Sequence, residues 1–484
     1  MLPAGFGLEL DPAVRRPRHE VLVGGAPIRV LRLSAAGAAM VDSWAEGGPV
    51  GRGPGAQALA GRLLDGGLAH PRPGAAAHPG PHDVTVVVPV RDDQSGLSAT
   101  LAAVGKVGAV VVVDDGSVRP ITADQAPGAT LIGRRTAGGP AAARNAGWRM
   151  AATEIVLFLD ADCAPAPGCL ATLLPHFADP QLAAVAPRVQ AGAGGATPAW
   201  LAAYEKLRSP LDLGLHEAPV RPGSAVPYVP TAALALRREA LEQTGGFDEA
   251  LRFGEDVDLV WRLGKRGWRV RYDPSASVTH PARPSASRWL AQRYQYGRAA
   301  APLAARHGRD VAPVASNPWS AAAWGLAAAG HPAAAAAVTV GTSAVLARRA
   351  GSDLVTARTL AGLALTGDVR AGPALAEAVR RAWLPPALIL AATSSRKGRS
   401  SAWPALVAAL TVPAAAEWMT GRVDASLPRG RPPSGDLPGD HPGPPDLGLV
   451  TWVALRLADD LAYQAGVWSG ALTARSAGAL LPRF

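Results

Sequence analysis

Three largely apolar runs mark the middle of the chain. They lie at Val84–Val90, 109–113 and 154–159, and helix-like segments separate them. A continuous run rich in β-branched residues is typical of a strand that is buried on both faces, as in a parallel sheet. The repeated order of strand, helix and strand therefore predicts an α/β domain of the nucleotide-binding type.

A different pattern precedes this block. Two apolar runs, 20–23 and 28–33, flank a glycine pair and predict a hairpin. A helix-like stretch follows Ser34, which is a suitable cap, and a second one spans 56–64. The order of hairpin, helix and helix resembles the small winged-helix-like recognition domains of ribosomal-peptide maturation systems, such as the pyrroloquinoline-quinone peptide chaperone. The alternative is a purely structural appendage.

Composition divides the chain into three expected domains. Its 484 residues predict about three domains by length alone. Stretches rich in proline and glycine at 71–82 and 427–445 have the character of linkers. We therefore expect a recognition-like domain at 1–74, an α/β domain at 83–311 and an Ala- and Trp-rich helical region at 312–484.

The last region raises a membrane question. Residues 319–346 are almost uncharged, and 383–392 and 403–416 are shorter apolar runs. A spanning helix needs roughly 20 apolar residues, and alanine is only weakly hydrophobic. Three interpretations stay open: helices lying on a membrane surface, a spanning pair, and a helical domain in water. The stretch 455–472, with an acidic pair inside it, predicts an amphipathic helix.

Charge and cysteine content exclude some classes of protein. The chain is 48% hydrophobic and 18% charged, which excludes a wholly disordered protein. Two cysteines cannot form a disulfide scaffold and suggest a reducing compartment. No basic-then-apolar stretch opens the sequence, so no secretory signal is expected. The net charge of +10 does not indicate nucleic acid, because no basic run is interleaved with aromatic residues.

Acidic residues follow two of the predicted strands. Asp114 and Asp115 come after the second strand, and Asp160 and Asp162 follow the third. Ligands bind beyond the carboxyl ends of strands in such sheets. Carboxylates two residues apart can hold Mg²⁺ or Mn²⁺ together with a diphosphate. The alternative is a solvated turn, which is less expected directly after a buried strand.

Three further positions carry candidate chemistry. Arg144 lies on a predicted helix and could pair with phosphate, unless it is a surface arginine. Glu255 and Asp256 open another helix, where a carboxylate could act as a general base or simply complement the helix dipole. His280 ends a strand-like run and could complete a metal site or be an ordinary strand-end histidine.

Together these motifs resemble the family 2 inverting glycosyltransferases. The series is Val-Val-Val-Pro-Val, Asp-Asp-Gly-Ser, Ala-Arg-Asn-Ala-Gly, Asp-Ala-Asp and Gly-Gly-Phe-Asp followed by Gly-Glu-Asp, within about residues 83–300. The resemblance implies a GT-A fold, with a Rossmann-like mixed sheet, and a metal-dependent hexosyltransferase. It implies donor-binding roles for a set of residues along the sheet edge: Pro89, Asp114, Asp115, Arg144 and Asp160.

The same resemblance implies the catalytic and metal roles. Asp162 and His280 would ligate Mn²⁺ or Mg²⁺, and Asp256 would be the base with Glu255 beside it. An acceptor sugar would meet Trp289, Gln292 and Arg293, although helix packing is the alternative for the aromatic residue. The glutamine, arginine and tryptophan of processive relatives are present without their usual spacing, so processivity is not predicted.

The combination of a recognition-like domain, a transferase and a helical tail resembles the mycofactocin-system glycosyltransferases. That family implies transfer of glucose from UDP-glucose to the peptide-derived redox cofactor mycofactocin or its precursor, building a β-1,4-glucan. From the cysteine content and the tail we expect a cytoplasmic enzyme that is associated with the inner face of the cell membrane. The alternatives are a transferase of cell-envelope or lipid-linked glycans and a non-catalytic peptide- or membrane-binding scaffold.

Overall fold

The computed structural model describes residues 1–74, 77–192, 197–348, 353–396, 402–420 and 446–484. The linker expected at 427–445 lies outside the described residues. The linker expected at 71–82 begins later than its composition suggested, because Pro71 and Arg72 belong to a strand, β5. Proline is tolerated there because β5 has a strand on one side only.

The central feature is a mixed sheet. In the described chain, nine strands form it in the order β10-β14-β11-β13-β9-β6-β7-β8, and β12 pairs with β14. The strands β6 to β9 are parallel, whereas β13 is antiparallel to both of its neighbours. Their bounds are β6 Val84–Val90, β7 Ala109–Asp114, β8 Thr130–Gly133, β9 Ile155–Leu159, β10 Ala164–Pro165, β11 Leu182–Gly192, β12 Ala218–Pro219, β13 Ala233–Arg237 and β14 Arg269–Pro281.

Alternation along β6 explains why this sheet is buried on both faces. Val87 packs into one hydrophobic cluster, and Val86 and Val88 pack into another. Helices supply the other half of each cluster. They are α3 Gln94–Val104, α4 Pro140–Trp148, α5 Cys169–Leu173, α7 Arg238–Thr244 and α8 Glu255–Lys265. Two further helices of this part of the chain, α6 Ala199–Arg208 and α9 Ala286–His307, pack into other clusters. The three apolar runs of the sequence are confirmed as β6, β7 and β9.

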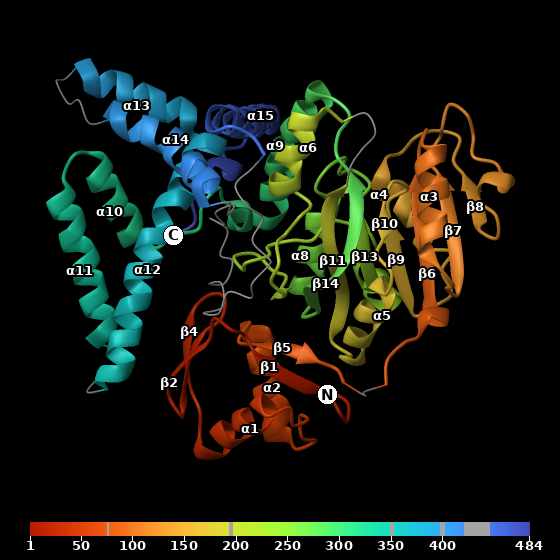
Figure 1. The fold of residues 1–484 in the computed structure, drawn as a ribbon, viewed down its shortest axis with the longest axis horizontal. Coiled ribbons are helices and arrows are strands. Elements are labelled where there is room, and N and C mark those ends of the chain that lie inside the picture. The colour runs from red at the N-terminus through yellow and green to blue at the C-terminus, as the bar shows by residue number, and fades with distance from the viewer. Residues whose placement is uncertain (75–76, 193–196, 349–352, 397–401, 421–445) are drawn as a thin grey trace.

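The N-terminal residues form a small unit of strands and two helices, drawn in red in Figure 1. The predicted hairpin is confirmed as β3 paired with β4, and Ser34 caps the first helix by accepting from the Gly37 N–H at 3.1 Å. The second helix ends at Gly67, whose positive φ of 64° favours glycine. The elements are β1 Gly7–Leu10, β2 Arg15–Arg18, β3 Val21–Gly24, β4 Arg29–Arg32, α1 Ala35–Ala45, α2 Pro54–Gly66 and β5 Ala69–Arg72.

Ion pairs connect this N-terminal unit to the domain that contains the central sheet and to the C-terminal helical region. Asp65 accepts from Arg269 of β14 at 2.7 Å. On the other side, Asp353 accepts from Arg18 of β2 at 2.6 Å. Val21 and Val23 pack with Leu360 of a C-terminal helix, so that helix covers part of the three-stranded sheet β2-β3-β4.

The C-terminal region is helical, as expected. Its elements are α10 Pro318–Ala328, α11 Pro332–Arg348, α12 Leu354–Ala378, the π-helical turn η5 Val379–Trp383, α13 Leu384–Arg396, α14 Ala402–Thr420 and α15 Leu449–Ala474. The uncharged run 319–346 is two helices, α10 and α11, because Gly330 and Pro332 interrupt it. These features confirm the predicted fold class.

Helix α15 crosses α9 at very short range, and Figure 1 shows the two side by side. A Cβ on Gly297 of α9 would lie 2.0 Å from the Tyr463 carbonyl oxygen, and one on Gly466 of α15 would lie 2.0 Å from that of Tyr294. Only glycine allows the two backbones to approach so closely. We call this crossing the glycine seam.

The acidic pair of α15 points inward, which corrects the predicted amphipathic helix. Asp459 binds Arg293 of α9 at 3.0 Å, and Asp460 binds Arg380 at 2.7 Å. Both carboxylates are buried. They face the interior because these arginines need partners there.

No helix in the described ranges is long and apolar enough to cross a membrane. The expectation of a spanning pair therefore finds no support in those ranges. Exposed large apolar side chains are nevertheless concentrated after residue 312. On α13 and α14 they include Leu388, Ile389, Leu390, Trp403, Val407, Val412 and Met419.

Candidate active site

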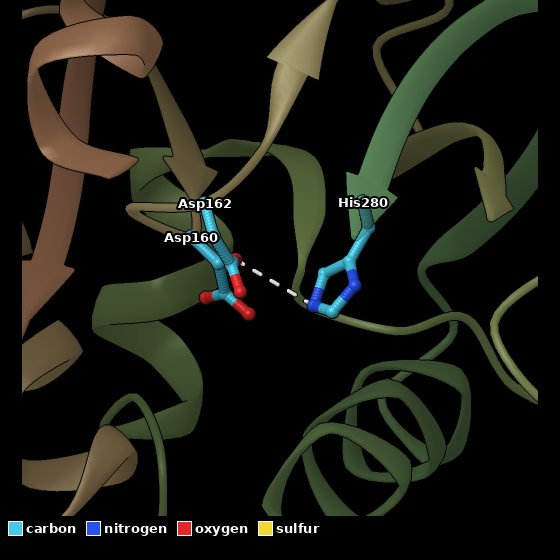
Figure 2. A group of neighbouring side chains, drawn as sticks. All are labelled: Asp160, Asp162 and His280. Carbon is cyan, nitrogen blue, oxygen red and sulfur yellow. Dashed lines mark ion pairs between the residues drawn. The ribbon is translucent and has the colours of Figure 1, made fainter. Parts of the chain in front are cut away.

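Asp160, Asp162 and His280 gather where β9 and β14 end. Asp160 and Asp162 follow β9 directly, and His280 lies near the end of β14. Pairing of β10 with β14, through Ala164 and Thr279, holds the loop after β9 against that end. One ligand atom from each side chain lies within 4.8 Å of the others, and Figure 2 shows the two carboxylates facing the imidazole. The sequence placed these residues together correctly.

The imidazole of His280 is oriented by its own chain. Its Nδ1 lies 2.8 Å from the Pro281 carbonyl oxygen, which accepts a hydrogen from it, and its Nε2 lies 3.5 Å from Asp162 Oδ1. In the neutral imidazole, Nε2 would then carry a lone pair on the side of the carboxylates, as in metal-ligating histidines. Two oxygens and one nitrogen form a donor set that suits Mn²⁺ or Mg²⁺.

Charge crowding at these carboxylates favours a cation. Burial raises the pKa of Asp162, the neighbouring Asp160 raises it further, and His280 opposes the shift. Both acids keep more than a quarter of their side-chain surface exposed. A divalent cation placed between them would remove their repulsion and would remain reachable by a ligand.

Arg144 of α4 connects this cluster to the start of α8. Its Nη2 donates to Asp160 Oδ1 at 2.7 Å and its Nη1 donates to Glu255 Oε1 at 2.9 Å. Burial lowers the pKa of Arg144, but the two carboxylates outweigh that effect and keep it raised. The guanidinium is buried and bonded to protein groups, so the expectation that it meets a diphosphate is not supported by this arrangement.

Asp256 is the second residue of α8. Burial raises its pKa to about 7, the Glu255 charge adds to the shift, and Arg144 opposes it. Its Oδ1 accepts from the Val257 N–H at 2.8 Å. A carboxylate with a pKa near neutrality can take a proton from a hydroxyl group and release it again.

Glycine sets the direction of this helix start. Gly254 caps α8 with a positive φ of 80°, and a Cβ there would lie 2.9 Å from Leu303 and 3.3 Å from Ala299, both of α9. The start of α8 is thus pressed against α9.

Asp114 and Asp115 have partners inside the protein. Asp114 accepts from the N–H groups of Ser117 and Ile121 at 2.9 and 3.0 Å. Asp115 accepts from Gly138 and Gly139 at 2.9 and 2.8 Å, and from the Arg134 guanidinium. These bonds shape the loops at the sheet edge. Pro89 lies at the same edge, near the end of β6, where it pairs with Val113 of β7.

The three candidate acceptor residues differ in how deeply they are buried. Trp289 is 1% exposed and donates from Nε1 to Glu205 at 3.0 Å. Arg293 is 2% exposed and pairs with Glu205 and Asp459. Packing between helices therefore occupies both, and the expectation that they face an acceptor is wrong. Gln292 lines a small cavity beside His280 and remains a candidate acceptor-binding residue.

That cavity contains groups the sequence did not suggest. Glu205 of α6 and Arg283 line it together with His280 and Gln292. Burial raises the pKa of Glu205, with Arg293 opposing. No local motif marks Glu205 of α6 or Arg283 of the loop between β14 and α9, because contacts between distant segments bring them together.

Comparisons with known proteins agree with this geometry. Residues 85–245 match the family model described as Glycosyl transferase family 2. The chain is 38% identical to the Pre-mycofactocin glycosyltransferase of Mycobacterium tuberculosis, in the CDC 1551 / Oshkosh strain and in ATCC 25618 / H37Rv alike. That alignment spans 491 residues and covers 100% of this chain and 98% of the relative.

Two other similarities are more limited. An N-acetylglucosaminyl-diphospho-decaprenol L-rhamnosyltransferase of M. tuberculosis is 43% identical over 82 residues, which is 17% of this chain and 24% of that one. The mannosyltransferase PcManGT from Pyrobaculum calidifontis, solved in complex with GDP-Man and Mn²⁺, is 21% identical in sequence, with a TM-score of 0.35. That alignment covers 68% of this chain and 85% of the mannosyltransferase chain. The full-length match is the decisive one. The chain is a glycosyltransferase of family 2 and belongs, within it, to the family of the pre-mycofactocin glycosyltransferases.

Proposed function

We propose that this enzyme transfers glucose from UDP-glucose to the mycofactocin precursor, with inversion at the anomeric carbon, and extends the product into a β-1,4-glucan. The acceptor follows from the full-length relationship to the M. tuberculosis protein. The observation that carries the catalytic part is the Arg144 bridge, which ties the metal-type cluster at Asp160 to the acid pair that contains Asp256.

The bridge suits a single displacement. The acceptor oxygen forms a bond to the anomeric carbon while the bond from that carbon to the diphosphate oxygen breaks on the opposite face. Asp256 accepts the hydroxyl proton, and its pKa of about 7 suits this task. Arg144 and Glu255 hold the start of α8 close to Asp160, which would keep the base near the donor for an in-line attack.

The metal site fits the same scheme. Asp162 and His280, with Asp160 beside them, would hold Mn²⁺ or Mg²⁺. When bound, the ion supplies positive charge that neutralises the nucleoside diphosphate. Pro89 and the loops shaped by Asp114 and Asp115 would form the nucleoside pocket at the same sheet edge.

We assign the three parts of the chain different tasks. Residues 83–311 would bind donor and metal, and residues 1–74 would serve as a recognition-like domain. The exposed apolar residues of α13 and α14 support contact of the region 312–484 with the inner face of the cell membrane. This contact would be peripheral.

Mass spectrometry of the products tests the function. The purified full chain is incubated with UDP-glucose, Mn²⁺ or Mg²⁺, and the lactam formed from the precursor peptide's terminal valine and tyrosine. We expect mass increments of one and then several hexoses, and none with Asp256→Asn. A parallel reaction with decaprenyl diphosphate sugars tests the envelope-glycan alternative. Hexose transfer to that lipid alone would overturn the acceptor assignment, and no transfer to either would favour the scaffold alternative.

A further inference from the structure

The helices after residue 312 reach the side of the site where Asp256 lies. Gly254, just before the acid pair, is pressed against Ala299 and Leu303 of α9. Tyr296 precedes Ala299 by three residues, so it lies on the same face of α9, near the start of α8. The glycine seam then places α15 directly against α9. A continuous chain of contacts therefore runs from α8 through α9 to α15.

Three tyrosines occupy this region. Tyr296 accepts from Gln292 at 2.9 Å, and Gln292 lines the cavity beside His280. Tyr463 of α15 packs with the cluster that contains Ala300, one turn after Tyr296. Tyr228 lies in the loop between β12 and β13 and follows Pro227, whose carbonyl oxygen accepts from Trp261 Nε1 of α8 at 2.7 Å. All three residues are half-buried.

Electrostatics places the same residues near one another. Burial raises the pKa of Tyr228, and the charges of Asp256, Tyr296 and Tyr463 add to that shift. Burial also raises the pKa of Tyr296 to about 12, with Asp256 among the contributing charges. The phenols thus share an environment with the proposed base.

Arg381 of η5 fixes the C-terminal member of this group. Its guanidinium lies 3.9 Å from the centroid of the Tyr463 ring and donates to Glu377 at 3.1 Å. A guanidinium stacked on a ring face immobilises that ring. Tyr463 is therefore held in place before any ligand arrives, and little conformational entropy is lost on binding.

We propose that Tyr228, Tyr296 and Tyr463 form the acceptor-binding surface beside Asp256, with Arg381 as the residue that positions Tyr463. The surface suits a flat ring that carries hydroxyl groups, because tyrosines offer both a ring face and a polar oxygen. Two acceptors share that chemistry, the phenol-bearing lactam and its glucosylated form. This inference rests on the proposed function for the identity of the acceptor.

Calorimetry with the full-length enzyme measures the affinity for the lactam, for its glucosylated form and for UDP. We expect Tyr463→Ala and Tyr228→Ala each to weaken binding of an acceptor by about tenfold and to leave UDP binding unchanged. Tyr463→Phe should keep most of the affinity, since the ring face remains. The matched control is Tyr294→Phe, because Tyr294 lies on the same helix but donates to Ser469 at 2.8 Å.

The outcomes separate this inference from the donor assignment. Loss with the lactam alone identifies an aglycone site, and loss with the glucosylated form alone identifies a site for the growing glucan. Unchanged affinity for both acceptors in both alanine variants overturns the inference, as does failure of the wild type to bind either. Binding without transfer from UDP-glucose refutes the proposed donor and leaves this surface standing. Tyr228 lies outside the glycine seam, so its variant decides the matter if Tyr463→Ala does not fold.

Discussion

Arg144 Nη1 lies 2.9 Å from Glu255 Oε1, and the two residues are 111 positions apart in the sequence. Both side chains are nearly inaccessible, at 5% and 9% exposure. The pair closes the space between α4 and α8 and fixes the proposed base relative to Asp160. The stability of this region and the pH dependence of the site are expected to depend on this contact.

Removing the guanidinium should destabilise the whole enzyme. Arg144→Gln leaves the Glu255 charge buried without a partner, and breaking such a pair costs about 3–5 kcal/mol. Chemical denaturation monitored by circular dichroism measures the loss. Arg149→Gln, at the exposed end of the same helix, should change the unfolding free energy by less than about 0.5 kcal/mol. Equal effects of the two variants would contradict a special role for the bridge.

The acidic limb of the pH profile should report Asp256. Its pKa of about 7 means that activity is present above that pH and is lost as the pH falls through it. The Glu255 charge contributes to the raised pKa, so Glu255→Gln should move the limb to lower pH. Steady-state rates from pH 5 to 9 check this, with the exposed Glu242→Gln as control. A limb that stays in place in Glu255→Gln would assign it to another group.

Metal affinity should depend on the strand-end cluster. His280→Ala and Asp162→Asn each remove one ligand, and we expect Mn²⁺ binding to weaken by about 100-fold. Electron paramagnetic resonance titration of free Mn²⁺ measures it directly. Asp124→Asn changes an exposed carboxylate in the short 3-10 helix Ala123–Gln125 and should leave the affinity unaltered. If all three variants bind Mn²⁺ like the wild type, the metal lies elsewhere.

Trp289 should matter for folding. Its ring is fully buried among Tyr204, Leu201 and Trp452, and Trp289→Ala should cost about 3–5 kcal/mol of unfolding free energy. The exposed Trp319→Ala should cost less than about 0.5 kcal/mol. Thermal denaturation and acceptor KM are measured together. An intact melting temperature with a raised KM would restore the acceptor role that burial argues against.

A single glycine-to-alanine substitution, which adds one methyl group, tests the close backbone contact in the glycine seam. Gly466→Ala places a Cβ 2.0 Å from a backbone oxygen, so α9 and α15 must separate, at a cost of about 1–3 kcal/mol. Gly341 of α11 has no atom within 4 Å of the same added group. Gly341→Ala should therefore raise stability by about 0.5–1 kcal/mol. A stabilising Gly466→Ala would show that the helices are not in backbone contact.

The central sheet and the acidic residues of the site could be predicted from the local sequence. Val84–Val90 is apolar at nearly every position because both faces of β6 are covered, and that pattern is visible without any partner. Asp160 and Asp162 could be placed because they directly follow a buried run. The same reasoning grouped them with His280, since strand ends meet at one edge of the sheet.

Contacts between distant segments could not be predicted in this way. Arg293 and Asp459 are 166 residues apart, and nothing in the periodicity of either helix indicates that their charges meet. The sequence therefore placed Arg293 at an acceptor and predicted only an amphipathic helix around Asp459. Arg144 was likewise assigned to phosphate, because an arginine near a nucleotide site has no local sign that two carboxylates already hold it.

The seam between α9 and α15 also decides how the protein can be divided for experiments. The composition changes near residue 312, but the packing does not, since α9 ends before that point and its covering helix begins at Leu449. A recombinant fragment ended at 311 would expose the bare backbone at Gly297 and would lack Asp459, one of the two carboxylates that pair with the buried Arg293. Such a fragment is expected in inclusion bodies, and crystallisation or directed evolution of the catalytic half should begin from the entire polypeptide.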